Sequence, residues 1–155
     1  MRRFLTHILF LLFYASLLPA KTVHVGVHFS SKTIREGLAK LNSGDTLLVH
    51  EGVYKEGNIL IDKSVFVIGL NYPVLDGQKK HEVVSIKANH VLFKGFKVQR
   101  SGFATLDDPG AIKVYDRNYV TIRDNILEDN FFGIYIQNSK NCLIQHNSII
   151  AFGKE

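Results

Sequence analysis

The sequence predicts an all-β protein that folds as a right-handed parallel β-helix, a solenoid with about 22 residues in each coil. Three observations support this fold class: one pattern recurs 22 residues apart, short alternating strands are separated by polar turns, and a single helical segment stands near the N-terminus. A β-sandwich also has short strands, but it does not require equivalent residues at one fixed spacing. The right-handed sense follows from the general rule for parallel crossovers.

The first twenty residues, MRRFLTHILFLLFYASLLPA, have the features of a secretory signal peptide. Two arginines precede an apolar stretch over residues 4–18, and a small residue, Ala20, follows. The stretch is shorter than the roughly 20 apolar residues that a membrane span needs. We therefore expect cleavage after Ala20, with an uncleaved anchor as the alternative. Residues 21–155 then form one exported β-helix domain without a membrane span.

The composition of the mature chain excludes two other classes of protein. Without Arg2 and Arg3, 17 Lys and Arg stand against 14 Asp and Glu, a net charge of +3. Because the basic residues are scattered, no nucleic-acid-binding surface is expected. Cys142 is the only cysteine, so the chain has no internal disulfide and its stability must come from packing and backbone hydrogen bonds.

The first elements of the mature chain are a strand in KTVHVGVHFS and a helix in SSKTIREGLAKLNSGD. Ile34, Leu38 and Leu41 recur at helical spacing, and Thr33 with Glu36 would form a capping box. This helix is short and apolar on one side only. We expect it to cover the otherwise open first coil, as terminal repeats of solenoids must.

After Gly44 the chain has the chemistry of strands. Five segments alternate at period two and are rich in Val, Ile and aromatic residues: DTLLVHEGVY, GNILIDKSVFVIG, EVVSIKANHVLFKGFKV, GAIKVYDRNYVTIRDNIL and FGIYIQNSKNCLIQHNSI. Asn, Asp, Gly and Lys separate strands of only three to five residues. No helical pattern lies between them.

The repeat is clearest in NYVTIRDN and KNCLIQHN, which are residues 118–125 and 140–147. Four positions map onto four others at a spacing of 22: Val120, Ile122, Asn125 and Leu127 onto Cys142, Ile144, Asn147 and Ile149. Ile112 and Val114 map in the same way onto Ile134 and Ile136, and Val84 and Ile86 precede them. One coil earlier, the equivalent positions are Val91, Phe93, Phe96 and Val98. They precede Val120, Ile122, Asn125 and Leu127 by 29 residues, which is one period plus a seven-residue insertion in SGFATLDDPG.

Stacking of these coils would place equivalent residues about 4.8 Å apart. Equivalent apolar residues then form inward ladders, among them Ile122 with Ile144 and Val120 with Cys142. Asn125 and Asn147 can form hydrogen bonds along the axis. We interpret Cys142 as a small buried apolar side chain, with a metal ligand or nucleophile as the alternative.

The candidate polar sites are few. Asp107 and Asp129 are 22 residues apart, as are Asp108 and Asn130. Carboxylates about 5 Å apart could act as a glycosidase pair or bind Ca²⁺, whereas a polar turn is the alternative. His24 and His28, on one expected strand, would lie about 13 Å apart. We expect the histidines to be solvated, with a site assembled between coils as the alternative.

Several segments resemble, in order and spacing, the N-terminal half of the NosD family of periplasmic β-helix proteins: IREGLAKLNSGDTLLVHEGVYKE, PVLDGQ, VLFKGFKVQRSG, DDPGAIKV and IRDNILEDNFFGIYIQNSKNCLIQHNSI. The resemblance covers residues 33–149. GDTLLVHEGVY is shared by many pectin-lyase-like β-helices. The combination of RSG, an inserted acidic loop, GAIKV and LEDNFFGIYI is more specific.

The resemblance implies a periplasmic accessory protein, and not an enzyme, that acts with an ABC-type ATPase and permease. Its role would be maturation of nitrous oxide reductase, by supporting assembly of the copper–sulfur centre. Copper is implied only by the resemblance: the mature chain has no Met, one Cys and no pair of histidines at ligand spacing, so the metal ligands stay unassigned. The family is longer, so we expect further coils, or another chain, beyond IIAFGKE.

The alternative function is a carbohydrate-binding or polysaccharide-acting β-helix. Phe131, Phe132 and Tyr135 beside Asp129 could form an aromatic platform for it, provided that Tyr135 points outward. An inactive fragment of either protein is a third possibility.

Overall fold

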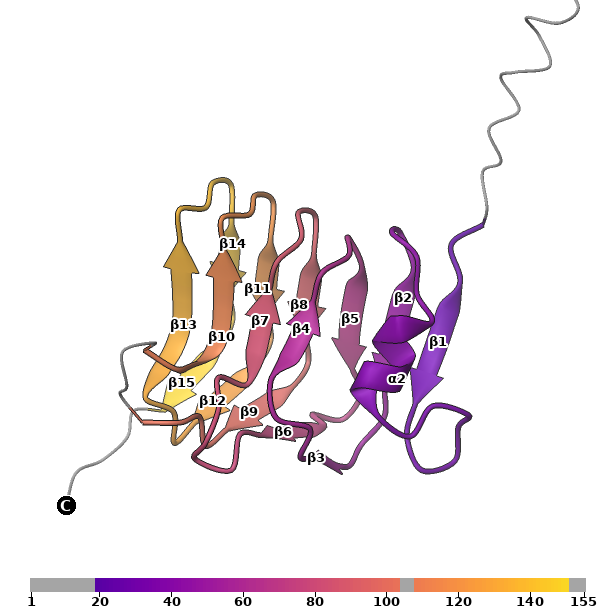
Figure 1. The fold of residues 1–155 in the computed structure, drawn as a ribbon, viewed down its shortest axis with the longest axis horizontal. Helices are drawn as coiled ribbons and strands as arrows, with labels where there is room; N and C mark the ends of the chain where they lie inside the picture. Colours follow the sequence, from indigo (N-terminus) through magenta and orange to yellow (C-terminus); the bar gives the residue numbers. More distant parts are fainter. Residues whose placement is uncertain (1–18, 104–107, 151–155) are drawn as a thin grey trace, which may run out of the picture.

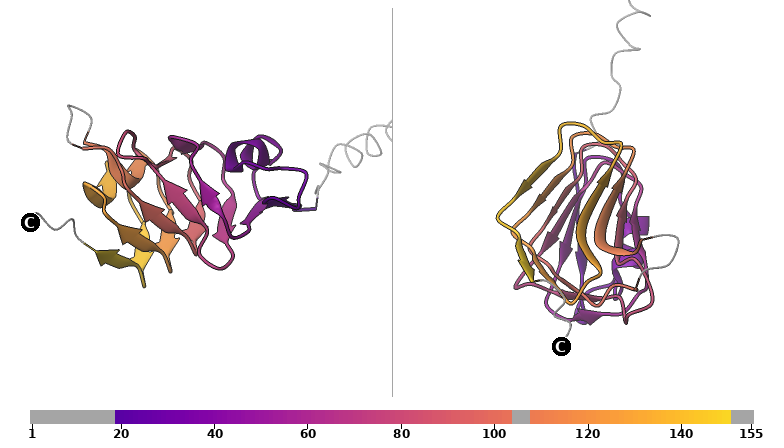
Figure 2. Two further views of the ribbon diagram at one scale, coloured as in Figure 1. Left: turned by 90° about the horizontal axis from the view of Figure 1, so that it is seen from below. Right: turned by 90° about the vertical axis from the view of Figure 1, so that its left-hand side faces the viewer.

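The computed structural model describes residues 19–103 and 108–150, which form a parallel β-solenoid of about five turns with one short helix. Its strands lie side by side in three parallel sheets (Figure 1). Viewed along the axis, the coils superpose around a common interior (Figure 2). The predicted parallel β-helix is therefore confirmed; its handedness stays a prediction. Residues 1–18 of the predicted signal peptide, residues 1–20, lie outside the described part, so the signal peptide stays a prediction.

Each complete coil contributes one strand to each sheet. The six-stranded sheet contains, in order, β1 (Thr22–Val25), β2 (Thr46–Val49), β5 (Phe66–Gly69), β8 (Leu92–Lys94), β11 (Thr121–Arg123) and β14 (Leu143–Gln145). The five-stranded sheet contains β3 (Val53–Tyr54), β6 (Val74–Asp76), β9 (Lys97–Gln99), β12 (Ile126–Glu128) and β15 (Ser148–Ile150). The four-stranded sheet contains β4 (Ile59–Ile61), β7 (Val84–Ile86), β10 (Gly110–Tyr115) and β13 (Phe132–Gln137).

The pairing of the strands confirms the predicted columns. Residues 22 apart are register partners in the last coils, including Ile112 with Ile134, Ile122 with Ile144 and Leu127 with Ile149. Across the insertion, Phe93 pairs with Ile122 and Val98 with Leu127. The seven extra residues lie between β9 and β10, and the ladders continue unchanged on either side of them.

The interior is one continuous apolar core made by the inward residues of all three sheets. Phe93 and Phe96 fill its centre as a stacked pair with ring centroids 4.5 Å apart. The predicted asparagine column is confirmed inside this core. Asn125 Nδ2 donates to Asn147 Oδ1 over 2.9 Å, and the Phe96 N–H donates to Asn125 Oδ1 over 3.0 Å.

The predicted helix is α2 (Ile34–Ala39), and its predicted capping box is present: Thr33 is the N-cap residue and Glu36 returns the hydrogen bond. The helix contacts β1, β2 and β4, so it lies over the N-terminal end of the solenoid (Figure 1). Gly37 permits this close packing, because a Cβ there would lie 2.5 Å from Val25 Cγ2.

The last described coil, β13 to β15, has no further coil stacked on it among the described residues. Large apolar side chains are consequently exposed there, including Ile144, Ile149 and Ile150. Cys142 occupies the predicted column and packs against the core, but it is only half-buried. The predicted inward position of Cys142 is therefore confirmed, but the side chain is less buried than predicted.

Candidate functional site

Two pockets lie beside the insertion between β9 and β10. The first, here called the end pocket, has a volume of about 520 Å³ and opens beside the last described coil. The second, here called the sheet-face pocket, has a volume of about 600 Å³ and lies on the outer face of the four-stranded sheet. Phe103 lines both.

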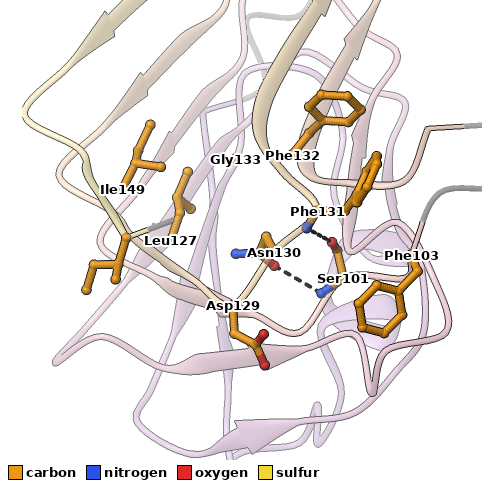
Figure 3. A pocket seen from close by; sticks show the side chains of 10 residues that line it. Ser101, Phe103, Leu127, Asp129, Asn130, Phe131, Phe132, Gly133 and Ile149 are labelled. Atoms are coloured by element: carbon orange, nitrogen blue, oxygen red, sulfur yellow. Dashed lines mark hydrogen bonds between the residues drawn. The ribbon is translucent and has the colours of Figure 1, made fainter. Parts of the chain in front are cut away.

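The end pocket is apolar on two sides and has a hydrogen-bonded floor. Phe103, Phe131 and Phe132 lie on one side of it, and Leu127 and Ile149 on the other (Figure 3). The floor connects two neighbouring coils through three hydrogen bonds: Ser101 N–H to Asn130 Oδ1 (3.0 Å), Phe131 N–H to Ser101 Oγ (2.9 Å) and Asn130 Nδ2 to Val98 O (2.9 Å). These bonds connect the segment after β9, at Ser101, with the β12–β13 turn.

Charged side chains continue from this floor along the outside of the five-stranded sheet. The Arg100 guanidinium binds both carboxylate oxygens of Asp76, which is buried. Burial alone would raise the pKa of Asp76, but the hydrogen bonds from Arg100 and the Gln78 N–H outweigh it and lower this pKa. Asp129 forms an ion pair with Lys79, with 3.5 Å between Lys79 Nζ and Asp129 Oδ2.

The sheet-face pocket is organised around the carboxylate of Glu82. The Tyr115 hydroxyl donates to Glu82 Oε2 over 2.6 Å, and the Ser85 hydroxyl donates to Oε1. Asn58 Nδ2 donates to Ser85 Oγ over 2.7 Å. Lys113 Nζ lies 3.6 Å from Glu82 Oε2. Three outward side chains, from β7 and β10, thus share the Glu82 carboxylate, and Asn58, from the segment before β4, holds Ser85 from the other side.

Lys113 is buried even though it lies on the outer face of the sheet, with a relative exposure of 5%. Its ammonium lies 5.0 Å from the ring centroid of Tyr115 and 4.9 Å from that of Tyr135. Burial opposes its charge, but hydrogen bonds and charge interactions with Tyr115 and Glu82 outweigh this and raise the pKa of Lys113. Burial and the hydrogen bond to Glu82 also raise the pKa of Tyr115, so its phenol stays protonated at neutral pH.

The predicted acidic column lies only partly within the described residues, so it stays a prediction. Asp107 lies outside the described residues. Asp108 is exposed and lines the sheet-face pocket, whereas Asn130 is buried and lines the end pocket, so the two side chains do not line one pocket. Asn130 instead binds the backbone of Ser101 in the preceding coil. Asp129 lines the end pocket, where Lys79 neutralises it.

The predicted aromatic platform is divided between the two pockets. Phe131 and Phe132 line the end pocket with Asp129, their rings packed edge to face at 4.7 Å. The platform required Tyr135 to point outward, and it does so, because its neighbours Ile134 and Ile136 pack against the core. It lines the other pocket, with Lys113 and Tyr115.

The predicted distance between His24 and His28 is wrong in its premise, because β1 ends at Val25 and His28 follows in a turn. His24 instead meets His50 on the next coil, with 3.0 Å between His24 Nδ1 and His50 Nε2. The ring of His24 stacks on Phe29, and the ring of His50 packs against Phe29 at a tilt. Across residues 19–103 and 108–150, no group of three or more His, Cys, Asp or Glu side chains is placed to hold a metal ion.

The residues missed from the sequence are Glu82, Ser85, Lys113 and Tyr115. One signal could have indicated them: Lys113 stands between the inward residues Ile112 and Val114, so it and Tyr115 must point outward next to Tyr135. Glu82 gives no such signal. It precedes its strand, and its partner Tyr115 is 33 residues away, a spacing that is not the period of the coil.

Comparisons of the chain with protein-family models, with curated proteins and with solved structures found no match. In the part of the chain that the structure describes, no helix has the length and apolar character needed to cross a membrane.

Proposed function

We propose that this chain is an exported accessory protein of the NosD kind, which supports maturation of nitrous oxide reductase in the periplasm together with an ABC-type ATPase and permease. In this role the solenoid supplies a docking surface and performs no reaction itself. The copper is cargo for the reductase, and the proposal assigns no copper ligand to the described residues of this chain.

The observation that carries the proposal is the meeting of three sequence segments around the insertion. RSG, GAIKV and LEDNFFGIYI are the segments most specific to the resemblance. Ser101 of the first binds Asn130 and Phe131 of the third, and β10, which contains the second, pairs with β13. The three segments, residues 100–102, 110–114 and 127–136, thus lie together on neighbouring coils. Such convergence is expected if the surface has a common task.

The physical character of this surface suits docking. Its floor is fixed by hydrogen bonds between coils, and Phe131 and Phe132 are exposed above it. Exposed aromatic side chains on a rigid base are typical anchors of protein interfaces, because little conformational entropy is lost when they are covered.

Deletion of the gene in its own organism tests the proposal. We expect the reductase polypeptide to accumulate in the periplasm with a deficit of copper, measured by metal analysis of the purified enzyme. Wild-type chain supplied in trans should restore the copper content. Phe131→Ala with Phe132→Ala should restore it less well than Tyr119→Ala, which removes an exposed aromatic ring from a distant turn. A fully loaded reductase in the deletion strain would refute the proposal.

A further inference from the structure

We propose that the buried carboxylate of Asp45 is the binding site for the new N-terminus of the chain, the α-ammonium group that removal of the signal peptide exposes at Lys21. Processing then adds an ion pair that fastens β1, the first strand of the solenoid. The inference rests on the expected export of the chain, and not on its role in the maturation of the reductase.

The backbone of Lys21 is held on both sides of its Cα atom. Its N–H donates to Asp45 Oδ1 over 2.9 Å, and its carbonyl oxygen accepts from the Thr46 N–H over 2.9 Å. Hydrolysis of the Ala20–Lys21 bond by a signal peptidase consumes one water: Ala20 leaves with a carboxylate, and Lys21 keeps its nitrogen as an α-ammonium group. The nitrogen that already faces Asp45 thus changes from a neutral donor into a cation.

Asp45 is an acceptor that is fixed in place before the N-terminus arrives. Its relative exposure is 4%, and its Oδ2 accepts from the Asn42 N–H over 2.7 Å. Its backbone carbonyl accepts from the Phe66 N–H over 3.0 Å. The hydrogen bonds from the Asn42 and Lys21 N–H groups outweigh burial and lower the pKa of Asp45, so the group is an anion at neutral pH. Little conformational entropy is lost when a cation binds to such a group.

Among the described residues, the charged side chain that forms an ion pair with Asp45 is that of Lys21 itself. Its Nζ lies 3.9 Å from Asp45 Oδ2, and the side chain is 48% exposed. Exposed pairs of this kind contribute little, because a long side chain must be ordered and water screens the charges. The α-ammonium group is closer and belongs to a backbone that is already held. It is therefore the better partner for the carboxylate.

The position of β1 gives the ion pair its effect on the fold. β1 lies at the end of the six-stranded sheet (Figure 1), and in the described part of the chain β2 is the one strand that pairs with it. Pro19 and Ala20, just before Lys21, are exposed and belong to no strand. An edge strand has fewer ladder bonds than an inner strand and opens more easily. An ion pair at its start opposes this opening.

The test begins with the exported protein, purified from the periplasm of its own organism. Mass spectrometry of the N-terminal peptide should show Lys21 as the first residue. An NMR titration should give the α-ammonium group a pKa above its ordinary value of about 7.7–8.0, because the Asp45 carboxylate favours the charged form. Asp45→Asn keeps an oxygen acceptor but removes the charge, so this variant should return the pKa of the α-ammonium group to the ordinary range.

Urea unfolding measures what the ion pair adds to stability. The processed chain, which begins at Lys21, is compared with an extended chain that begins at Pro19 and keeps the Lys21 nitrogen as an amide. The urea midpoint of the processed chain should be higher at pH 7. Because the pKa of the α-ammonium group is raised in the folded state, this advantage is complete below its unfolded pKa and is lost as the pH rises through its folded pKa. In Asp45→Asn the two chains should have the same midpoint.

Asp62→Asn is the matched control, because Asp62 is an exposed carboxylate between β4 and β5 and its loss changes the net charge equally. It should leave the pKa of the α-ammonium group and the difference in midpoint unchanged. Three results would overturn the proposal: an exported protein that begins at another residue, an α-ammonium group with a pKa in or below the ordinary range, or equal midpoints of the processed and extended chains at pH 7. None of these measurements involves the reductase, so they test the proposal separately from the maturation role.

Discussion

Replacing Asn125 by alanine tests whether the internal asparagine column stabilises the stacked coils. The Asn125 side chain is almost completely buried and makes three hydrogen bonds. Its Oδ1 accepts from the Phe96 N–H (3.0 Å), and its Nδ2 donates to Asn147 Oδ1 (2.9 Å) and to Phe93 O (3.4 Å). Alanine removes all three bonds and leaves the Phe96 N–H without this acceptor inside the core.

The expected loss follows from these contacts. A buried donor that loses its partner costs about 1–3 kcal/mol, and each neutral hydrogen bond contributes about 0.5–1.5 kcal/mol. The bond of 3.4 Å counts at the lower end of that range. We therefore expect Asn125→Ala to lower the free energy of unfolding by about 2–4 kcal/mol. For a domain of ordinary stability, about 5–15 kcal/mol, this is a large fraction.

Urea unfolding followed by far-UV circular dichroism measures the loss, with the slope m expected to stay unchanged. Asn118→Ala is the matched control: Asn118 accepts a similar hydrogen bond from the Lys140 N–H, but at an exposed turn where water can replace it. Its expected cost is about 0.5–1 kcal/mol. If the two variants lose equal stability, or if Asn125→Ala loses less than about 1 kcal/mol, the reasoning about the column is wrong.

Two further predictions concern the charged groups. The pKa of Asp76 is lowered in the folded protein, so its carboxylate stabilises the fold above the unfolded pKa of about 3.9, and this contribution is lost as the pH falls below that value. The free energy of unfolding is measured in urea between pH 7 and pH 3. Asp76→Asn should be less stable than the wild type at pH 7 and should lose less stability as the pH falls. If its free energy of unfolding declines as steeply as that of the wild type, the prediction is wrong. Glu82→Gln should cost about 2–3 kcal/mol, because the buried Lys113 ammonium loses its nearest carboxylate. Adding Lys113→Met should recover part of that loss in calorimetric melting, and a double variant that is no more stable than Glu82→Gln would argue against the pair.

The later coils could be predicted from the sequence because their columns repeat at a constant spacing. From Val84 onward, the predicted apolar partners within strands are register pairs in the structure, among them Ile112 with Ile134 and Ile122 with Ile144. The earlier coils have no constant spacing: Leu47 pairs with Val67, 20 residues on, and Val67 with Phe93, 26 residues on. Turns of different length hide the columns there, although the strand chemistry remains visible.

The candidate sites were less predictable for a related reason. A column predicts which residues lie above one another, but a pocket on the outer face also depends on side chains that reach between columns. Glu82 contacts Tyr115 in this way, and His24 contacts His50. Asn130, chosen for its spacing from Asp108, makes its hydrogen bonds with the backbone of the preceding coil, which the spacing did not indicate.

The insertion between β9 and β10 has a consequence for engineering. Ile112 and Val114 pair with Val84 and Ile86 on one side and with Ile134 and Ile136 on the other, although the chain is seven residues longer at this corner than in the next coil. Each coil thus takes its register from its own ladders and not from the length of its turns. A foreign peptide grafted at the equivalent corner of the next coil, between Asp129 and Phe132, should therefore be displayed beside the natural loop without disturbing the strands beneath it.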